Sequence, residues 1–403
     1  MIRPFAGEFL ISPCPLEMSL NVCSMGCKFC FSVLNSPTRT ADIPRITRLL
    51  ADYRNRETLE ARLLQEGYPV LCSNLVDVLA SSNDQQSIPL LRTMVELEIP
   101  FSIQSRGGKR VNELLDFIPP VVWYLSINQD NDALRKKIEP GAPSIESRVA
   151  LCEELTKRGH TVVIGFNPFV PEWWEDFPAM VQRLKDAGAY GAWIQRLHFN
   201  QKQIRVMPEK DKANLGADTI KQALRPQGRI DASYLQSAAE VVRDTGIAAY
   251  CTNLSSRTTV FQAYRKVYKK TFPIMQDWFD WCHEHLTPEA PIVSFEDFCS
   301  VMLPRLPQGE FYIRDFIGAN NRELWKEYDV PTRGTFKQLL ALVWGMPEMS
   351  HSPIGEDCFA YAGSVDGEQK TIFYDKENLP YLYFASQGHD KETMIVDAQE
   401  HFH

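Results

Sequence analysis

Three of the ten cysteines stand close together, and this run constrains the chain more than any other feature of its sequence. They are Cys23, Cys27 and Cys30, in a Cys-x3-Cys-x2-Cys spacing, whereas the other seven are isolated. Gly26 lets the backbone turn, so that the three thiols can converge on one centre. A structural zinc ion takes four ligands, and no second Cys-x2-Cys pair is present. Three thiolates with one open position favour a [4Fe–4S] cluster whose fourth iron can bind a further ligand.

A lone zinc knuckle, or three buried cysteines close by chance, is the alternative interpretation. The rest of the sequence favours reduced cysteines over disulfides, because ten cysteines in 403 residues are too few for a disulfide scaffold. Met1 to Leu10 do not read as an export signal, and no apolar run reaches the ~18 residues that would span a bilayer. We therefore expect a cytoplasmic protein with no membrane segment.

Strand and helix patterns alternate from residue 16 to about residue 197. The expected strands are 16–22, 69–73, 101–104, 121–127, 161–166 and 192–197, with helices at 56–66, 88–98, 111–117, 144–158 and 176–187. Such βα repeats predict an α/β fold with a parallel sheet and right-handed crossovers. A partial (β/α)6 barrel and an open doubly wound sheet both fit this string. In either, function is expected where the strands end.

The pattern changes after residue 200. Residues 201–230 are polar and basic without clean periodicity, which predicts a long loop or lid, followed by a helix at 232–244 and a strand at 247–251. We expect a core domain over residues 1–255. Residues 256–403 are expected to form a mostly helical accessory region with a small β element near 371–383.

The cysteine run resembles that of the radical S-adenosylmethionine (SAM) superfamily, and Phe29 matches the aromatic residue usual before the last cysteine. This resemblance implies a partial (β/α)6 radical-SAM barrel and a [4Fe–4S] cluster whose unique iron binds SAM. It also implies reductive cleavage of SAM to a 5′-deoxyadenosyl radical, and an electron donor such as a flavodoxin or a ferredoxin. A non-catalytic cluster-binding protein is the alternative.

Three polar clusters follow expected strands, at Cys72-Ser73-Asn74-Leu75-Val76-Asp77, at Gln104-Ser105-Arg106-Gly107 and at Ser126-Ile127-Asn128. Together with Glu139-Pro-Gly-Ala-Pro-Ser-Ile-Glu-Ser-Arg148 and Asn167-Pro168, they resemble the spore photoproduct lyase branch of the superfamily over residues 16–200. The resemblance implies that SAM is contacted by six residues: Ser73, Asn74, Asp77, Arg106, Ser126 and Asn128. Helix capping and ordinary surface charge are the alternatives.

Cys72 is the candidate catalytic residue. In the lyase branch, a cysteine at this place gives a hydrogen atom to the product radical, whereas most isolated cysteines are small buried residues. One departure stands against identity with the lyase, which has tyrosines on both sides of the last cluster cysteine. Here Phe29 and Phe31 take those places and have no hydroxyl to relay hydrogen. We therefore expect a relative with a different substrate or quenching route.

The net charge of −8 argues against a generic polyanion binder, so any nucleic-acid contact needs a local basic patch. Two stretches offer one: Arg196, His198, Lys202, Arg205, Lys210 and Lys212, and then Arg257, Arg265, Lys266, Lys269 and Lys270 with Phe261, Tyr264 and Tyr268 between them. Cations beside aromatic rings suit phosphate and base contacts. The expected substrate is a nucleobase in DNA or RNA. A peptide or small metabolite is the alternative substrate. For the second basic stretch, the alternative is a solvated helix face that packs its aromatic rings inward.

Overall fold

The computed structural model describes residues 2–4, 9–35, 40–224, 233–251, 260–316, 326, 329–346, 352–386, 388–389 and 394–402. The chain divides into two compact units. The first holds Met1–Arg3, Leu16–Leu254 and Thr258–Lys269, and the second holds Pro4–Pro15, Ser255–Arg257 and Lys270–His403. The contacts therefore group residues 258–269 with the first unit, whereas the sequence analysis placed them in the accessory region. None of the described helices is both long and apolar enough to cross a membrane.

The first unit is built on an eight-stranded sheet whose strands follow one another in sequence order. The strands are β1 (Ile2–Pro4), β2 (Leu16–Met18), β3 (Val70–Cys72), β4 (Phe101–Ser105), β5 (Val122–Ser126), β6 (Thr161–Phe169), β7 (Gly191–Arg196) and β8 (Ala248–Cys251). All neighbours from β2 to β8 are parallel. The carboxyl ends of these strands therefore open on one edge. This confirms the α/β fold and the partial barrel.

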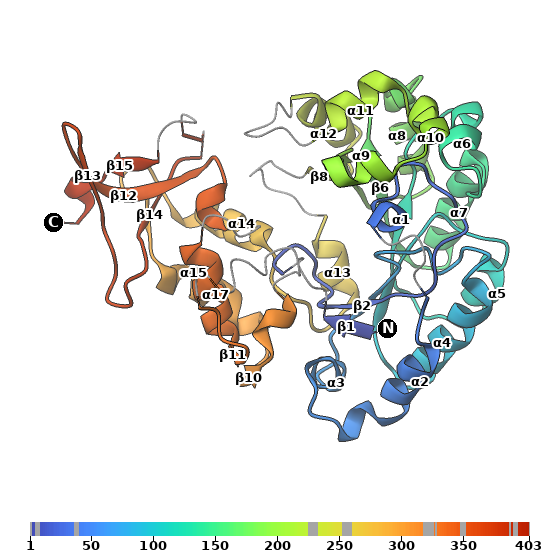
Figure 1. Cartoon of the computed structure of the whole chain (residues 1–403), viewed down its shortest axis with the longest axis horizontal. Helices are drawn as coiled ribbons and strands as arrows, with labels where there is room; N and C mark the ends of the chain where they lie inside the picture. The colour runs from blue at the N-terminus through green and yellow to red at the C-terminus, as the bar shows by residue number, and fades with distance from the viewer. Residues whose placement is uncertain are drawn as a thin grey trace. The chain divides into compact units, whose positions relative to one another are not determined.

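Helices connect the parallel strands and cover the outside of the sheet (Figure 1). They are α1 (Phe31–Asn35), α2 (Ile43–Asp52), α3 (Leu59–Gln65), α4 (Asp84–Glu96), α5 (Val111–Leu115), α6 (Asp132–Ile138), α7 (Ile145–Lys157), α8 (Phe177–Asp186) and α12 (Ser233–Asp244). The central strands are apolar on both faces because both faces are covered, as β5 illustrates with five buried residues in a row. Ser144 and Asp176 cap the amino ends of α7 and α8 with their side chains.

The expectation of a long loop over residues 201–230 is wrong. Three short helices occupy most of it, α9 (Gln201–Val206), α10 (Glu209–Leu215) and α11 (Ala217–Ala223), while residues 225–230 lie outside the described residues. Each helix presents only one or two apolar residues to the protein, so no amphipathic period could develop in the sequence. The buried residues Phe199, Met207, Leu215, Ile220 and Ala223 join one hydrophobic cluster with Phe29 of the cysteine run.

The second unit combines helices with a sheet. Its main helices are α14 (Met275–His285), α15 (Phe295–Met302) and α17 (Phe336–Gly345). A five-stranded sheet joins β9 (Ile292–Val293), β12 (Phe359–Asp366), β13 (Gln369–Ile372), β14 (Leu382–Phe384) and β15 (Ile395–Asp397), and β10 (Glu310–Phe311) pairs with β11 (Gly334–Thr335). The β element expected near 371–383 is thus part of a larger sheet and covers the end of β13 and most of β14.

The second basic and aromatic stretch does not present its rings to solvent. Phe261, Tyr264 and Tyr268 are each at least 94% buried around α13 (Gln262–Val267). The Tyr268 hydroxyl donates to the Phe101 carbonyl at 2.6 Å and accepts from the Val122 amide at 3.0 Å. These rings are core residues of the first unit and cannot stack on bases. Arg257 lies outside the described residues.

Candidate functional site

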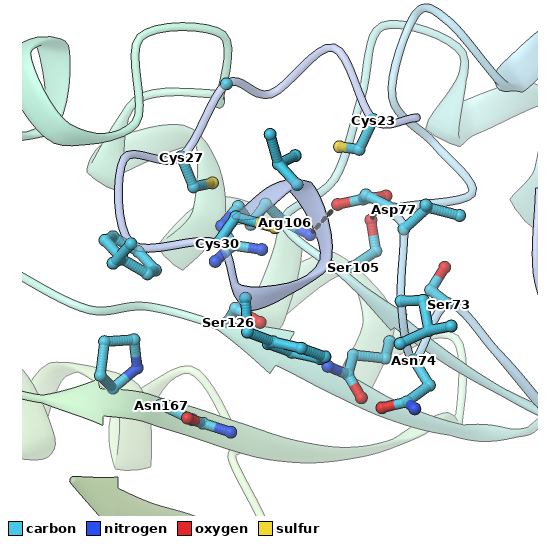
Figure 2. A pocket seen from close by; sticks show the side chains of 18 of the residues that line it. Cys23, Cys27, Cys30, Ser73, Asn74, Asp77, Ser105, Arg106, Ser126 and Asn167 are labelled. Atoms are coloured by element: carbon cyan, nitrogen blue, oxygen red, sulfur yellow. Dashed lines mark hydrogen bonds between the residues drawn. The ribbon is translucent and has the colours of Figure 1, made fainter. Parts of the chain in front are cut away.

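A cavity that opens to solvent lies at the carboxyl ends of the strands. Its wall includes all three residues of the cysteine run together with Ser73, Asn74, Asp77, Gln104, Ser105, Arg106, Ser126, Asn167, Arg196 and His198. In Figure 2, the cysteine loop lies on one side of this space, Ser126 and Asn167 lie across from it, and Ser73, Asn74 and Asp77 stand to one side. Distant parts of the sequence therefore meet at this cavity.

The cysteine loop is held by backbone hydrogen bonds to the end of α6 and to the segment that follows it. Gly26 adopts a positive φ of 68°, which a residue with a side chain would resist. The Lys28 amide donates to the Ile138 carbonyl, and the Gly141 amide donates to the Met25 carbonyl, each at 2.8 Å. A Cβ at Gly141 would lie 2.4 Å from the Ser24 carbonyl oxygen, so only glycine permits this close approach.

The thiols are partly buried, and their charge state depends on what they bind. Burial, assisted by the charge of Asp77, raises the pKa of Cys23 to about 12. Burial also raises the pKa of Cys27 well above its usual range, although the nearby Arg106 guanidinium opposes that shift. Without a bound metal, both side chains are therefore neutral thiols at pH 7. A metal that binds them must displace their protons.

A metal bound at this loop would need thiol ligands at a spacing that suits it. Within the described residues, no group of three or more His, Cys, Asp or Glu side chains is gathered tightly enough to hold a single ion. A zinc ion needs its thiolates at about 2.3 Å from one centre, whereas an iron–sulfur cluster distributes them over different iron atoms. Cys23, Cys27 and Cys30 line one cavity beside Arg106, and they are the residues that would hold a cluster.

Two of the predicted SAM contacts keep polar atoms available at the cavity. The Ser126 hydroxyl has no hydrogen-bond partner within the described part of the chain, although its residue is only 3% exposed and lines the cavity. Asn74 donates its amide to Glu17 at 3.0 Å, and its amide oxygen has no partner among the described residues. Both groups could therefore bind a ligand without losing an internal bond.

Ser73 and Asp77 line the same wall but already serve the fold. Ser73 has a positive φ of 91°, and its hydroxyl accepts the Val78 amide at 2.7 Å. The Asp77 carboxylate accepts from the Ser105 hydroxyl and the Arg106 amide, each at 2.8 Å, and from the Leu79 amide at 2.9 Å. Burial raises the pKa of Asp77. Asp77 thus joins the segment after β3 to the end of β4.

Asn128 and Cys72 lie behind the wall of the cavity. Asn128 is fully buried and donates its amide to the Pro168 carbonyl at 3.1 Å. Cys72 ends β3, is fully buried, and its thiol points to the Val70 carbonyl at a sulfur–oxygen distance of 3.9 Å. Neither is among the residues that line the cavity. Their roles in SAM contact and hydrogen donation are still predictions.

Several residues that line the cavity were not among the predicted SAM contacts. Asn167 at β6 donates to Gln195 of β7 at 2.9 Å, and Gln104 at β4 also faces this space. Phe31 lines the cavity and is 44% exposed. The signal for Asn167 and Gln104 was available, because each is a polar residue near the carboxyl end of a predicted strand.

Comparisons with known proteins give only distant likenesses. No protein-family model matches the chain, and no curated protein sequence matches it significantly. A solved structure of spore photoproduct lyase complexed with dinucleoside spore photoproduct is similar at 14% identity and a TM-score of 0.42, covering 59% of this chain and 77% of that one. Streptococcus suis SuiB bound to S-adenosylmethionine is similar at 14% identity and a TM-score of 0.38, covering 63% of this chain and 50% of that one.

Proposed function

We propose that this chain is a radical SAM enzyme that holds a [4Fe–4S] cluster on Cys23, Cys27 and Cys30 and cleaves SAM reductively. The observation that carries the proposal is the convergence of three thiols and three polar strand ends on one cavity. The cluster, when bound, would supply the electron that breaks SAM into methionine and a 5′-deoxyadenosyl radical. A flavodoxin or a ferredoxin is the expected electron donor.

The chain's own residues bind and orient the ligand in this proposal. Arg106 offers a cation beside the cysteine loop for the carboxylate of SAM. Ser126 and the amide oxygen of Asn74 offer hydrogen-bonding groups without protein partners among the described residues. The helices α9 to α11 pack against Phe29 and limit the access of water to the cysteine loop.

The proposed substrate is a nucleobase in DNA or RNA. Phe31 exposes 44% of its surface at the cavity, and Arg196 and His198 line the same space. An exposed ring near cationic side chains is the combination that binds a base and its phosphate. The basic residues Lys202, Arg205 and Lys210 are exposed on the adjoining helices α9 and α10. A peptide or small metabolite is the alternative substrate.

The substrate assignment is tested by anaerobic incubation of the cluster-loaded protein with SAM, dithionite and each of three candidates: duplex DNA, single-stranded RNA and a peptide mixture. Mass analysis of digested products should show a SAM-dependent change in a nucleobase. Replacing Phe31 with Ala should lower that yield while SAM cleavage without substrate is unchanged. A change found only in the peptide mixture would favour the alternative.

A further inference from the structure

A chain of three buried charges joins the cysteine loop to the cavity wall. Arg148 and Glu139 are both 0% exposed, and Arg106 is 16% exposed. The Arg148 guanidinium donates to one carboxylate oxygen of Glu139 at 2.9 Å, and Arg106 donates its Nε to the other at 2.6 Å. Each carboxylate oxygen of Glu139 therefore accepts from one of the two guanidinium groups.

Glu139 is fixed to the cysteine loop as well as to the two arginines. Its neighbours at positions 138 and 141 form the two backbone hydrogen bonds that hold the loop, to Lys28 and Met25. The Cys27 thiol also lies 3.8 Å from the carboxylate oxygen that Arg106 contacts. A shift of Glu139 would therefore move the guanidinium of Arg106 relative to the cysteines.

The two arginines use their donors differently. Arg148 donates to the backbone carbonyls of Ser126 and Pro143, each at 3.1 Å, and so is committed to the fold. Arg106 uses only its Nε, and its two Nη groups have no hydrogen-bond partner within the described residues. Within the described residues, the Nη groups of Arg106 are therefore the guanidinium donors of this cluster that are left for a ligand at the cavity.

We propose that Glu139 and Arg148 are positioning residues that aim the Nη groups of Arg106 at the carboxylate of SAM. The inference rests on the proposed function, since it requires that SAM binds in this cavity. A guanidinium held by its Nε leaves both Nη groups parallel and free for a two-point contact with a carboxylate. Lysine would offer a single ammonium nitrogen in place of this planar pair of Nη groups.

A double-mutant cycle tests the coupling. Glu139→Asp keeps the charge but withdraws the carboxylate from Arg106, and it is made in the wild-type chain and in an Arg106→Ala chain. The dissociation constant of SAM is measured by calorimetry on anaerobically cluster-loaded protein. Glu154→Asp is the matched control, because Glu154 accepts the Nε of Arg158 at the same 2.6 Å on the surface of α7. Unfolding temperatures establish that each variant is folded. If Glu139→Asp does not fold, Arg148→Lys takes its place in the cycle.

Glu139→Asp should weaken SAM binding about tenfold when Arg106 is present and less than about twofold when it is absent. Decarboxylated SAM should bind the wild type and Glu139→Asp equally, a result that general loosening of the fold would not give. Equal losses in both backgrounds, or unchanged binding, would overturn the inference while leaving the proposed function intact. A wild-type protein that takes up a cluster but binds no SAM would instead contradict the proposed function, and the inference with it.

Discussion

Single side chains at the cavity divide into those that hold the fold and those that keep polar atoms free for a ligand. Asp77 belongs to the first kind, with three internal hydrogen bonds, and Ser126 to the second. Sequence reasoning could not separate the two kinds, because both are polar residues after an apolar strand. The distinction depends on which hydrogen bonds the neighbouring segments complete.

Replacing Ser126 with Ala should weaken SAM binding about tenfold, the cost of one hydrogen bond to a charged ligand. Asn74→Ala should have a similar effect, since the Asn74 amide oxygen has no partner among the described residues. Calorimetric titration of cluster-loaded protein with SAM measures both, with Ser364→Ala on β12 of the second unit as the control. Normal SAM affinity in both variants would mean that neither side chain touches SAM.

For Cys72, the resemblance implies a hydrogen donor, whereas the structure shows a fully buried residue that does not line the cavity. If it gives hydrogen to a product radical, Cys72→Ala should leave SAM cleavage intact and change the product, because cleavage depends on the cluster. If it is only a core residue, the cost is a stability loss of about 1 kcal/mol with the product unchanged. The identity of the product, compared at equal SAM turnover, separates the two roles. The full burial of Cys72 favours the second.

At the scale of elements, helices α9 to α11 are the feature that sequence reasoning missed. Phe199 precedes α9, is fully buried and donates its amide to the Ala223 carbonyl at 2.7 Å, which ties the two ends of this segment together. Lys28 of the cysteine loop also pairs with Asp211 of α10 at 3.0 Å. The strands were predictable because apolar runs mark them, whereas these short helices depend on tertiary contacts.

Phe199→Ala should leave a cavity under these helices and cost about 3–5 kcal/mol of stability. Because Phe199 packs in the same cluster as Phe29, the variant should also lose its iron–sulfur absorbance faster in air than the wild type. Phe272→Ala, a buried ring in the second unit, is the control of similar cost. Equal bleaching rates in the two variants would argue against a shielding role for α9 to α11.

At the scale of the whole molecule, one buried histidine gives a pH dependence to stability. His160 is 6% exposed and accepts the Val121 amide at Nδ1 at 3.1 Å. Burial, with the charge of Arg158, lowers the pKa of His160 to about 4. The unfolded chain binds a proton at this residue near pH 6.5, whereas the folded chain does so only near pH 4. Stability is therefore full above pH 6.5 and falls as the pH is lowered toward 4.

His160→Asn keeps an acceptor for the Val121 amide but cannot be protonated. The variant should therefore show a flatter fall in unfolding free energy between pH 6.5 and pH 4 than the wild type, in urea titrations at each pH. A slope equal to that of the wild type would show that His160 is protonated in the folded protein over this range.

The division of the molecule was less accessible from sequence than its barrel. Residues 258–269 group with the first unit because Tyr264 and Tyr268 are buried there, and a basic, aromatic helix does not reveal which body it packs on. The convergence of the three cysteines, by contrast, could be predicted from their spacing alone. Three thiols within eight residues must lie close together wherever the loop is placed.

The central claim is that Cys23, Cys27 and Cys30 hold one cluster that cleaves SAM. Its most direct test is anaerobic reconstitution with iron and sulfide, followed by dithionite, SAM and quantification of 5′-deoxyadenosine, with Cys14→Ala as the matched cysteine control. The wild type and Cys14→Ala should bind about four irons and release 5′-deoxyadenosine, and Ala at position 23, 27 or 30 should abolish its release. Zinc bound in place of iron, or iron bound without any 5′-deoxyadenosine, would contradict the claim.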